Sequence, residues 1–344
     1  MNIVLVNTIV LVLCLASCRH TEPRGSAQPL TRLRIAVPLS PITYLPVYLA
    51  RELGYCAEQG LNVDLQEFSG GSKSLQAMFG GSADACASFY ELTIPLAAEG
   101  RHVQSFLTIL ERPGFILAVS PSSKRRIRRV EDLKGTVVGI STAGSSSQVF
   151  LNYLLRRHGV PLQDVSVSGI GLGALSIAAF TQERVDAAVL TGSAITSVQR
   201  RFPKLVSLAD ARTREGLREV YGIDIYPAHD LLAQTEWLQK NPATARKLTA
   251  AVMKSMRYMR EHSPEEIRSH MPAQYRVPDE QADLDALRAT IPMISPDGRV
   301  TPEEARAIKN VLAVSDEKLR TVRIDLASTY TNEFLPSHSP PQVR

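Results

Sequence analysis

The sequence predicts an α/β fold of two similar lobes, because one block of residues occurs twice. The copies occupy residues 71–85 and 173–188, and each runs from a glycine turn through a short apolar helix to an Asp-Ala strand entry. The opening glycine and the later aspartate both recur after 102 positions, as Gly71 and Gly173 and as Asp84 and Asp186. Each lobe is therefore expected to hold a mostly parallel sheet flanked by helices. Ligands of such sheets bind beyond the carboxyl ends of the strands, which predicts a cleft between the lobes.

Length and composition agree with two lobes. A chain of 344 residues, 44% of them hydrophobic, can bury more than one core. The net charge of +5 is spread along the chain apart from a basic run at 124–129. No aromatic residue interleaves with that run, so we interpret it as a solvated face and do not expect nucleic-acid binding.

The first lobe is expected to alternate strands with helices. Its strands are predicted at 34–39, 61–68 and 85–89, and its helices at 45–53 and from the loop at 69–72 through Phe79. Residues 108–120 form an extended segment that leads into the second lobe. Such a segment is a candidate hinge strand.

The second lobe repeats the pattern, and the chain then returns. Strands are predicted at 136–141, 165–169 and 187–191, a helix at 147–157, and a return crossing at 222–226. Helices are then expected at 236–238, 243–261, 264–271, 303–314 and 319–334, packed on the first lobe. The predicted boundaries are 33–118 plus 227–335 for the first lobe, 119–226 for the second, and 336–344 for a disordered tail.

The N-terminus carries an export signal. Residues 1–17 contain no charge, and their apolar core is shorter than the roughly 20 residues that a membrane-spanning helix needs. The core stops at Leu-Ala-Ser-Cys, which resembles the lipobox of bacterial lipoproteins and implies lipidation of Cys18. Residues 18–32 then form a flexible tether. An uncleaved anchor is the alternative interpretation.

Two further cysteines, Cys56 and Cys86, lie in the predicted first lobe. An exported location permits a disulfide between them. Cys86 falls inside an apolar strand, however, which favours two buried thiols that pack as small hydrophobic residues. No histidine lies near either, so we expect no metal site.

The strongest candidate ligand loop is residues 141–147, STAGSSS, between a strand and a helix. Small residues let the backbone approach a ligand, and the first-turn amides of a helix attract anions. A plain serine N-cap is the alternative, but it does not require so many hydroxyls. The candidate residues in this loop are Thr142, Gly144, Ser145, Ser146 and Ser147.

The remaining candidates come from the other strand ends. Small residues occur in the facing loop and at two ends in the second lobe: Ser69, Gly70, Gly71, Ser72, Gly173 and Thr191. Tyr44, Phe89 and Glu91 are the large or ionised groups expected there. An aromatic beside a strand is more often ordinary core. A lone carboxylate such as Glu91 would pair with an ammonium or ring amine, and no arginine is expected to clamp an acid group.

Catalytic patterns are absent from the sequence. None of the seven histidines falls in a predicted cleft loop, and neither a G-x-S-x-G elbow, an H-E-x-x-H motif nor a phosphate-loop lysine occurs. We therefore expect a binding protein without cofactor, metal or catalytic residues.

Several segments resemble the substrate-binding proteins of nitrate/sulfonate/taurine-type ABC importers, a group related to thiamine-pyrimidine synthases. They are residues 44–55, 60–65, 70–72, 84–85, 133–141 and 185–190. The resemblance implies a type II periplasmic binding fold whose lobes close on a small solute and hand it to a membrane permease. A thiamine-pyrimidine synthase of the same superfamily carries a cysteine-rich iron motif that this chain lacks.

The lipobox and the family resemblance together imply an exported protein of the periplasm or cell surface, anchored by lipid on Cys18, and we expect it to act as a monomer. Its solute would be an alkylsulfonate, taurine or a nitrate-like anion, held by Ser145–Ser147 with Ser69–Ser72 opposite. One alternative is a pyrimidine or other heteroaromatic solute stacked on Tyr44 or Phe89. A ligand sensor or an enzyme on the same fold is a further alternative.

Overall fold

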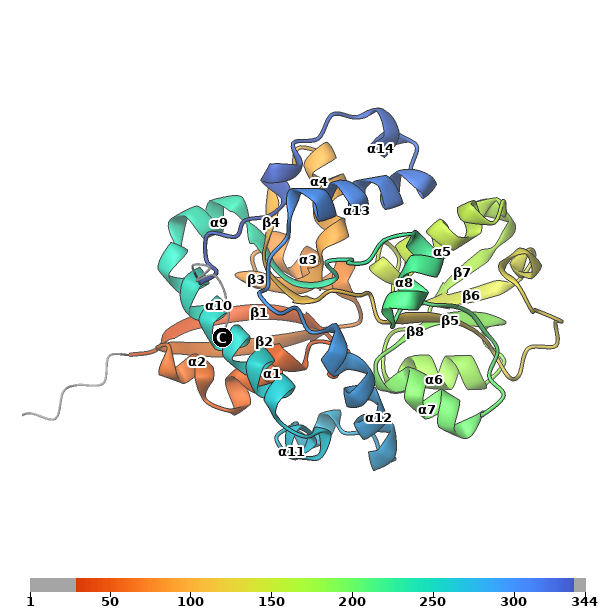
Figure 1. Cartoon of the computed structure of the whole chain (residues 1–344), viewed down its shortest axis with the longest axis horizontal. Helices are drawn as coiled ribbons and strands as arrows, with labels where there is room; N and C mark the ends of the chain where they lie inside the picture. The colour runs from red at the N-terminus through yellow and green to blue at the C-terminus, as the bar shows by residue number, and fades with distance from the viewer. Residues whose placement is uncertain (1–28, 337–344) are drawn as a thin grey trace, which may run out of the picture.

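The computed structural model describes residues 29–336, and the fold is two five-stranded sheets side by side (Figure 1). The predicted signal at 1–17, Cys18, most of the tether and the tail from 337 lie outside the described residues. The predicted α/β class and periplasmic binding fold are confirmed, because two mixed sheets with helices on their faces match the fold of known periplasmic binding proteins.

The two sheets share one topology. The first has the order β2-β1-β3-β10-β4 and the second the order β7-β6-β8-β5-β9. The first three strands of each order are parallel, and the fourth is antiparallel to both of its neighbours. The strands of the first sheet are β1 Thr31–Pro38, β2 Leu61–Phe68, β3 Ala85–Phe89, β4 Val103–Leu110 and β10 His229–Gln234. Those of the second are β5 Phe115–Val119, β6 Val137–Ile140, β7 Ser166–Gly169, β8 Ala187–Thr191 and β9 Ser207–Asp210.

The antiparallel strand of each sheet is the one that has just crossed from the other lobe. Strand β5 follows β4 and enters the second sheet, and β10 follows the second lobe and returns to the first. In register, His229 at the start of β10 lies beside Phe89, and Phe115 at the start of β5 lies beside Thr191. Strands β10 and β5 therefore begin beside the carboxyl ends of β3 and β8, respectively, where the lobes face each other.

Helices cover both faces of each sheet. The first lobe carries α1 Leu45–Glu52, α2 Tyr55–Glu58, α3 Gly71–Phe79 and α4 Thr93–Ala98. The second carries α5 Ser146–Arg157, α6 Ala174–Thr181, α7 Ser193–Arg201 and α8 Arg214–Tyr221. The C-terminal part carries α9 Thr235–Lys240, α10 Pro242–Glu261, α11 Pro264–Ser269, α12 Glu280–Thr290, α13 Pro302–Ser315 and α14 Lys318–Thr321.

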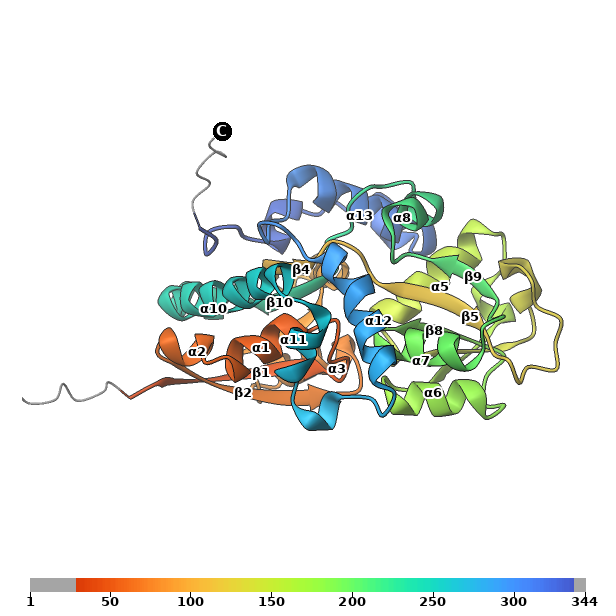
Figure 2. The same cartoon turned by 60° about the horizontal axis from the view of Figure 1, so that its bottom comes forward.

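The C-terminal helices touch both lobes, whereas the sequence predicted packing on the first. Helix α10 covers α1, α2 and β4 as expected. Helix α12 packs against α7, where Thr196 Oγ1 donates to the Ala282 carbonyl at 2.7 Å, and α13 packs against α5. Figure 2 shows α12 lying between the lobes. The apolar face of α13 joins a core that also contains Phe89 and Phe150, so one core continues from lobe to lobe.

The helix predicted over 319–334 is wrong beyond its first turn. After α14 the chain forms a 3-10 turn at Leu326–Thr329, in which the Ser328 and Thr329 hydroxyls donate to nearby carbonyls. The Thr331 amide then donates to the Ser105 carbonyl of β4 at 2.7 Å. Pairing with a sheet edge satisfies this backbone in place of a helix.

Cys56 and Cys86 are both buried and unbonded to each other, in α2 and β3. Within residues 29–336, none of the helices combines the length and apolar character that crossing a bilayer demands.

The returning strand β10 makes a testable contribution to stability. Leu232 is fully buried where β10 lies between β3 and β4, so Leu232→Ala should lower the free energy of unfolding by about 2–5 kcal/mol. Leu30→Ala, at a position with 47% exposure, should change it by less than about 0.5 kcal/mol. Urea unfolding followed by circular dichroism measures both. Equal effects would mean that β10 is not a central strand.

Candidate functional site

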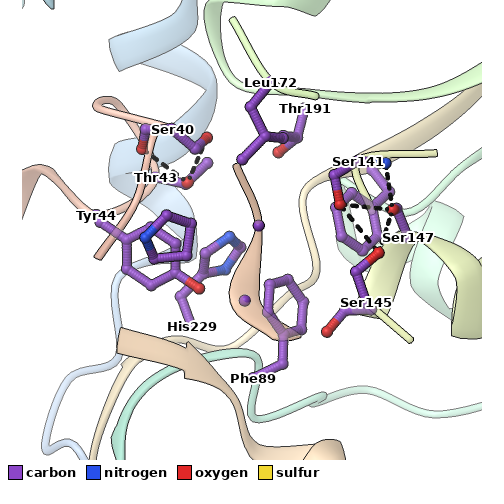
Figure 3. Close-up of a pocket in the computed structure, with 15 residues that line it drawn as sticks. Ser40, Thr43, Tyr44, Phe89, Ser141, Ser145, Ser147, Leu172, Thr191 and His229 are labelled. Atoms are coloured by element: carbon purple, nitrogen blue, oxygen red, sulfur yellow. Dashed lines mark hydrogen bonds between the residues drawn. The ribbon is translucent and has the colours of Figure 1, made fainter. Parts of the chain in front are cut away.

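The candidate site is a pocket where the carboxyl ends of the two sheets meet (Figure 3). The first lobe lines it with Pro38, Ser40, Thr43, Tyr44, Gly70, Gly71, Phe89 and His229, and the second with Phe115, Ser141, Ser145, Ser146, Ser147, Leu172 and Thr191. It encloses about 30 Å³. An apolar cavity of about 150 Å³ is needed to hold benzene, so an organic solute enters only when the lobes separate.

Two helices begin at this pocket from opposite lobes. Helix α3 begins at Gly71 and α5 at Ser146, and neither has a side chain that caps its first-turn amides. The first two amides of each helix precede its backbone ladder, whereas the Lys73 and Gln148 amides donate to the Gly70 and Ser145 carbonyls at 3.0 and 2.9 Å. The macrodipoles add partial positive charge at both starts, so the pocket attracts an anion without a cationic side chain.

The serine loop does not cap α5, which excludes the plain N-cap interpretation. Ser141, Ser145 and Ser147 bond one another instead, with Oγ–Oγ distances of 2.8–2.9 Å, and the Ser141 amide donates to Ser147 Oγ at 2.9 Å. The prediction that the loop at Ser145–Ser147 holds the acid group stays a prediction: all three residues line the pocket, but two of the hydroxyls are bonded within the loop. Ser146 is the member of that run whose buried hydroxyl has no partner.

Aromatic rings form the opposite wall. Tyr44 meets His229 edge-on at a centroid distance of 4.9 Å, and Phe89 lies 4.4 Å from the same imidazole. Phe89 also stacks on Phe115 from the second lobe at 5.3 Å. Burial lowers the pKa of His229 to about 3, so the imidazole is neutral at physiological pH. No residue of this described lining carries a charge at neutral pH.

Several buried polar atoms of the pocket have no hydrogen-bond partner. Among the described residues, four that line the pocket carry such an unpartnered atom: Tyr44 Oη, Ser146 Oγ, Thr191 Oγ1 and His229 Nδ1. Ser88 Oγ, behind Gly71, and Glu91 Oε2 are also unpartnered. An unpaired buried polar group costs about 1–3 kcal/mol, so the cluster favours a polar ligand that satisfies it.

Glu91 lies behind the pocket wall rather than in it. Its side chain is buried, and burial raises its pKa to about 8 although the nearby Ser146 hydroxyl opposes the shift. Neither Ser146 Oγ nor Glu91 Oε2 has a partner with full hydrogen-bond geometry. The expectation that Glu91 receives an amine of the solute is therefore not supported by its position: the carboxyl is outside the lining and uncharged over much of the neutral range.

The rim of the pocket carries direct contacts between the lobes. Ser72 Oγ lies 2.9 Å from Thr142 Oγ1 and donates to the Ala143 carbonyl at 3.0 Å. Gly70 sits so close to Thr142 that an added Cβ would lie 2.5 Å from its hydroxyl. The two glycine and serine loops therefore close on each other across the cleft.

The structure brings together most, but not all, of the predicted site residues. Tyr44, Gly70, Gly71, Phe89, Ser145, Ser146, Ser147 and Thr191 line the pocket. Ser72 and Thr142 lie at its rim, Gly144 and Gly173 line neighbouring cavities, and Ser69 lines none of these. The sequence analysis missed His229, because β10 was not predicted. Residues 229–234 show no period-two alternation that would reveal a strand, because β10 is buried on both faces.

Within residues 29–336, no group of three or more His, Cys, Asp or Glu side chains is arranged to hold a metal ion.

Residues 42–267 match the family model described as NMT1/THI5 like. The chain belongs to the NMT1/THI5-like family. Among curated proteins, it is 22% identical over 326 residues to the putative binding protein YtlA of Bacillus subtilis, covering 91% of this chain and 90% of that protein. It is also 22% identical over 228 residues to the pyrimidine phosphate synthase THI11 of Saccharomyces cerevisiae, covering 63% of each chain.

Solved structures that resemble this NMT1/THI5-like chain have the same fold. A protein of Bordetella bronchiseptica RB50 superposes with a TM-score of 0.82 at 30% identity, over 88% of this chain and 95% of that one. The alkanesulfonate-binding protein SsuA of Xanthomonas axonopodis pv. citri, bound to MOPS, superposes at 0.65 with 18% identity, over 88% and 98%. The likeness to importer binding proteins inferred from the sequence is thereby confirmed at the level of the fold.

Burial of Glu91 predicts a pH dependence. A carboxyl whose folded-state pKa lies above its unfolded value makes folding less favourable as pH rises from about 4.5 to about 8. Glu91→Gln should remove that loss and make the protein more stable than wild type at pH 8, by on the order of a few kcal/mol. Thermal melts at pH 5 and pH 8 measure it, with the exposed Glu99→Gln as control. An unchanged pH profile for Glu91→Gln would contradict the assignment.

Proposed function

We propose that this protein is an extracytoplasmic solute-binding lipoprotein that delivers a small organic acid, with an alkylsulfonate as the leading candidate, to an ABC importer. Taurine and nitrate-like anions are the other members of this solute class. The fold supports solute binding, because family members with it bind small solutes. The acid group would lie between the starts of α3 and α5.

The observation that carries the proposal is the combination of two uncapped helix starts with unpartnered buried polar atoms in one uncharged pocket. A sulfonate has three acceptor oxygens, which suit first-turn amides and the hydroxyls of Tyr44, Ser146 and Thr191. A cation would meet partial positive charge from both helices. A solute that carries one acid group therefore fits better than an amine.

The other parts of the proposal rest on the sequence and on relatives. The apolar segment before Cys18 supports export and lipid anchoring, and the likeness to SsuA supports a permease partner in the cytoplasmic membrane. Action as a monomer belongs to the same proposal.

Cys18→Ser should move the protein from the membrane fraction to the soluble extracytoplasmic fraction, as immunoblotting of cell fractions would reveal. Retention in the membrane fraction would favour the uncleaved anchor.

A heteroaromatic solute is the second candidate. The rings of Tyr44, Phe89 and His229 at the pocket favour it, and THI11, which shares 22% identity, is named as a pyrimidine phosphate synthase. The buried position of Glu91 removes the carboxylate expected to bind an exocyclic amine. The name of THI11 also bears on the enzyme alternative, whereas a sensor with the same ligand site has no specific observation in its favour.

Two substitutions of Tyr44 separate the candidates. Tyr44→Phe removes the hydroxyl and keeps the ring, so it should weaken sulfonate binding about tenfold or more and leave a stacked pyrimidine nearly unaffected. Tyr44→Ala should weaken both. Calorimetry on protein freed of endogenous solute, with methanesulfonate and a pyrimidine, measures these changes. Binding of the pyrimidine alone, insensitive to Tyr44→Phe, would overturn the acid assignment.

A further inference from the structure

A second, larger chamber adjoins the pocket. It encloses about 230 Å³ and shares Ser40 and Thr191 with the pocket lining, so the two cavities lie on either side of this pair. The loops that carry this shared pair are held in place by local contacts. Thr43 Oγ1 donates to Ser40 Oγ at 2.9 Å, and Gly192, at φ +56°, brings its turn within contact distance of that loop. A side chain at Gly192 would be strained.

The outer wall of the chamber is residues 274–278, held by a buried carboxylate. Asp283 of α12 has a fully buried side chain and accepts from the Val277 amide at 3.0 Å and from Arg268 Nε at 3.2 Å. Tyr275 packs edge-on against Tyr48 of α1 at 4.7 Å. These contacts make the wall part of the folded structure and not a loose loop.

The chemistry of the chamber is mainly apolar. The aliphatic groups that face it include Leu39, Ile42, Ile177, Ala194 and Val277. Arg276 is the one charged residue in the described lining, and two of its guanidinium nitrogens donate to the carbonyls of residues 269 and 271. No carboxylate of the described lining is available to pair with an ammonium group.

We propose that this chamber, which we call the tail chamber, holds an uncharged aliphatic tail of the solute whose acid group occupies the pocket. The inference rests on the proposed function and narrows it to alkanesulfonates or similar amphiphilic acids with one charge. Its volume exceeds the 150 Å³ that accommodates benzene, so a chain of several carbons fits. A taurine-like solute is disfavoured, because its ammonium would be desolvated beside Arg276 without a counter-ion.

The test is isothermal calorimetry of the full protein with methane-, propane- and pentanesulfonate and with 3-aminopropanesulfonate. Affinity should rise about fourfold with each added methylene, as expected for burial of apolar surface. The amino compound should bind at least tenfold more weakly than propanesulfonate, which has the same number of carbons.

A matched pair of variants on α6 assigns the effect to the tail chamber. Ile177→Trp fills it and should flatten the dependence on chain length while methanesulfonate still binds, which also shows that the variant is folded. Leu175→Trp, at a position with 66% exposure outside the lining, should keep the wild-type dependence.

The outcomes separate the two proposals. If methanesulfonate binds but the longer chains gain nothing, or if Ile177→Trp keeps the full chain-length dependence, the tail chamber is overturned and the proposed function stands. Equal binding of the amino compound and propanesulfonate likewise overturns the uncharged tail. If none of the sulfonates binds, methanesulfonate included, the proposed function itself is contradicted, and the tail chamber with it.

Discussion

The pocket depends on polar groups that the fold buries and leaves without partners. Tyr44, Ser146 and His229 are each less than a tenth exposed, yet each has a polar atom with no hydrogen bond in the described structure. Most buried polar atoms in folded proteins are paired, and four of the unpartnered ones in the described structure gather at this pocket. Here the first-turn amides of α3 and α5 add further donors at the same place. Under the proposed function, a solute that supplies acceptors pairs with these groups and thereby favours the closed arrangement of the lobes.

The exchange of strands between the lobes explains why these groups converge. Because β5 and β10 each cross and then run antiparallel in the sheet they enter, both start at the carboxyl ends of β3 and β8. The crossings deliver Phe115 and His229 to the pocket, and the loops before α3 and α5 deliver the two helix starts. The two lobes approach each other closely only where the residues between them are small. At Gly70, for example, there is no room for a side chain beside Thr142. Helices α12 and α13 add contacts between the lobes away from the pocket.

The sequence predicted those parts that depend on local patterns. The bounds of β2, β3 and β8 and the end of α3 at Phe79 follow from short apolar runs next to glycine turns. Strand β10 becomes a strand through pairing with β3 and β4, which are distant in sequence, so His229 could not be placed. The different roles of the serines could not be predicted from the sequence either. The hydrogen bonds among Ser141, Ser145 and Ser147 depend on how the loop folds back on itself. Burial of Glu91 arises from packing between the lobes, which a single sequence does not reveal.

The most direct measurement is a crystal structure of the protein with propanesulfonate. The account predicts sulfonate oxygens within hydrogen-bond distance of the first-turn amides of α3 and α5 and of the Tyr44 hydroxyl, with the lobes closed around them. A sulfonate bound elsewhere, or one in the cleft that leaves both helix starts and Tyr44 without contact, would contradict the central claim.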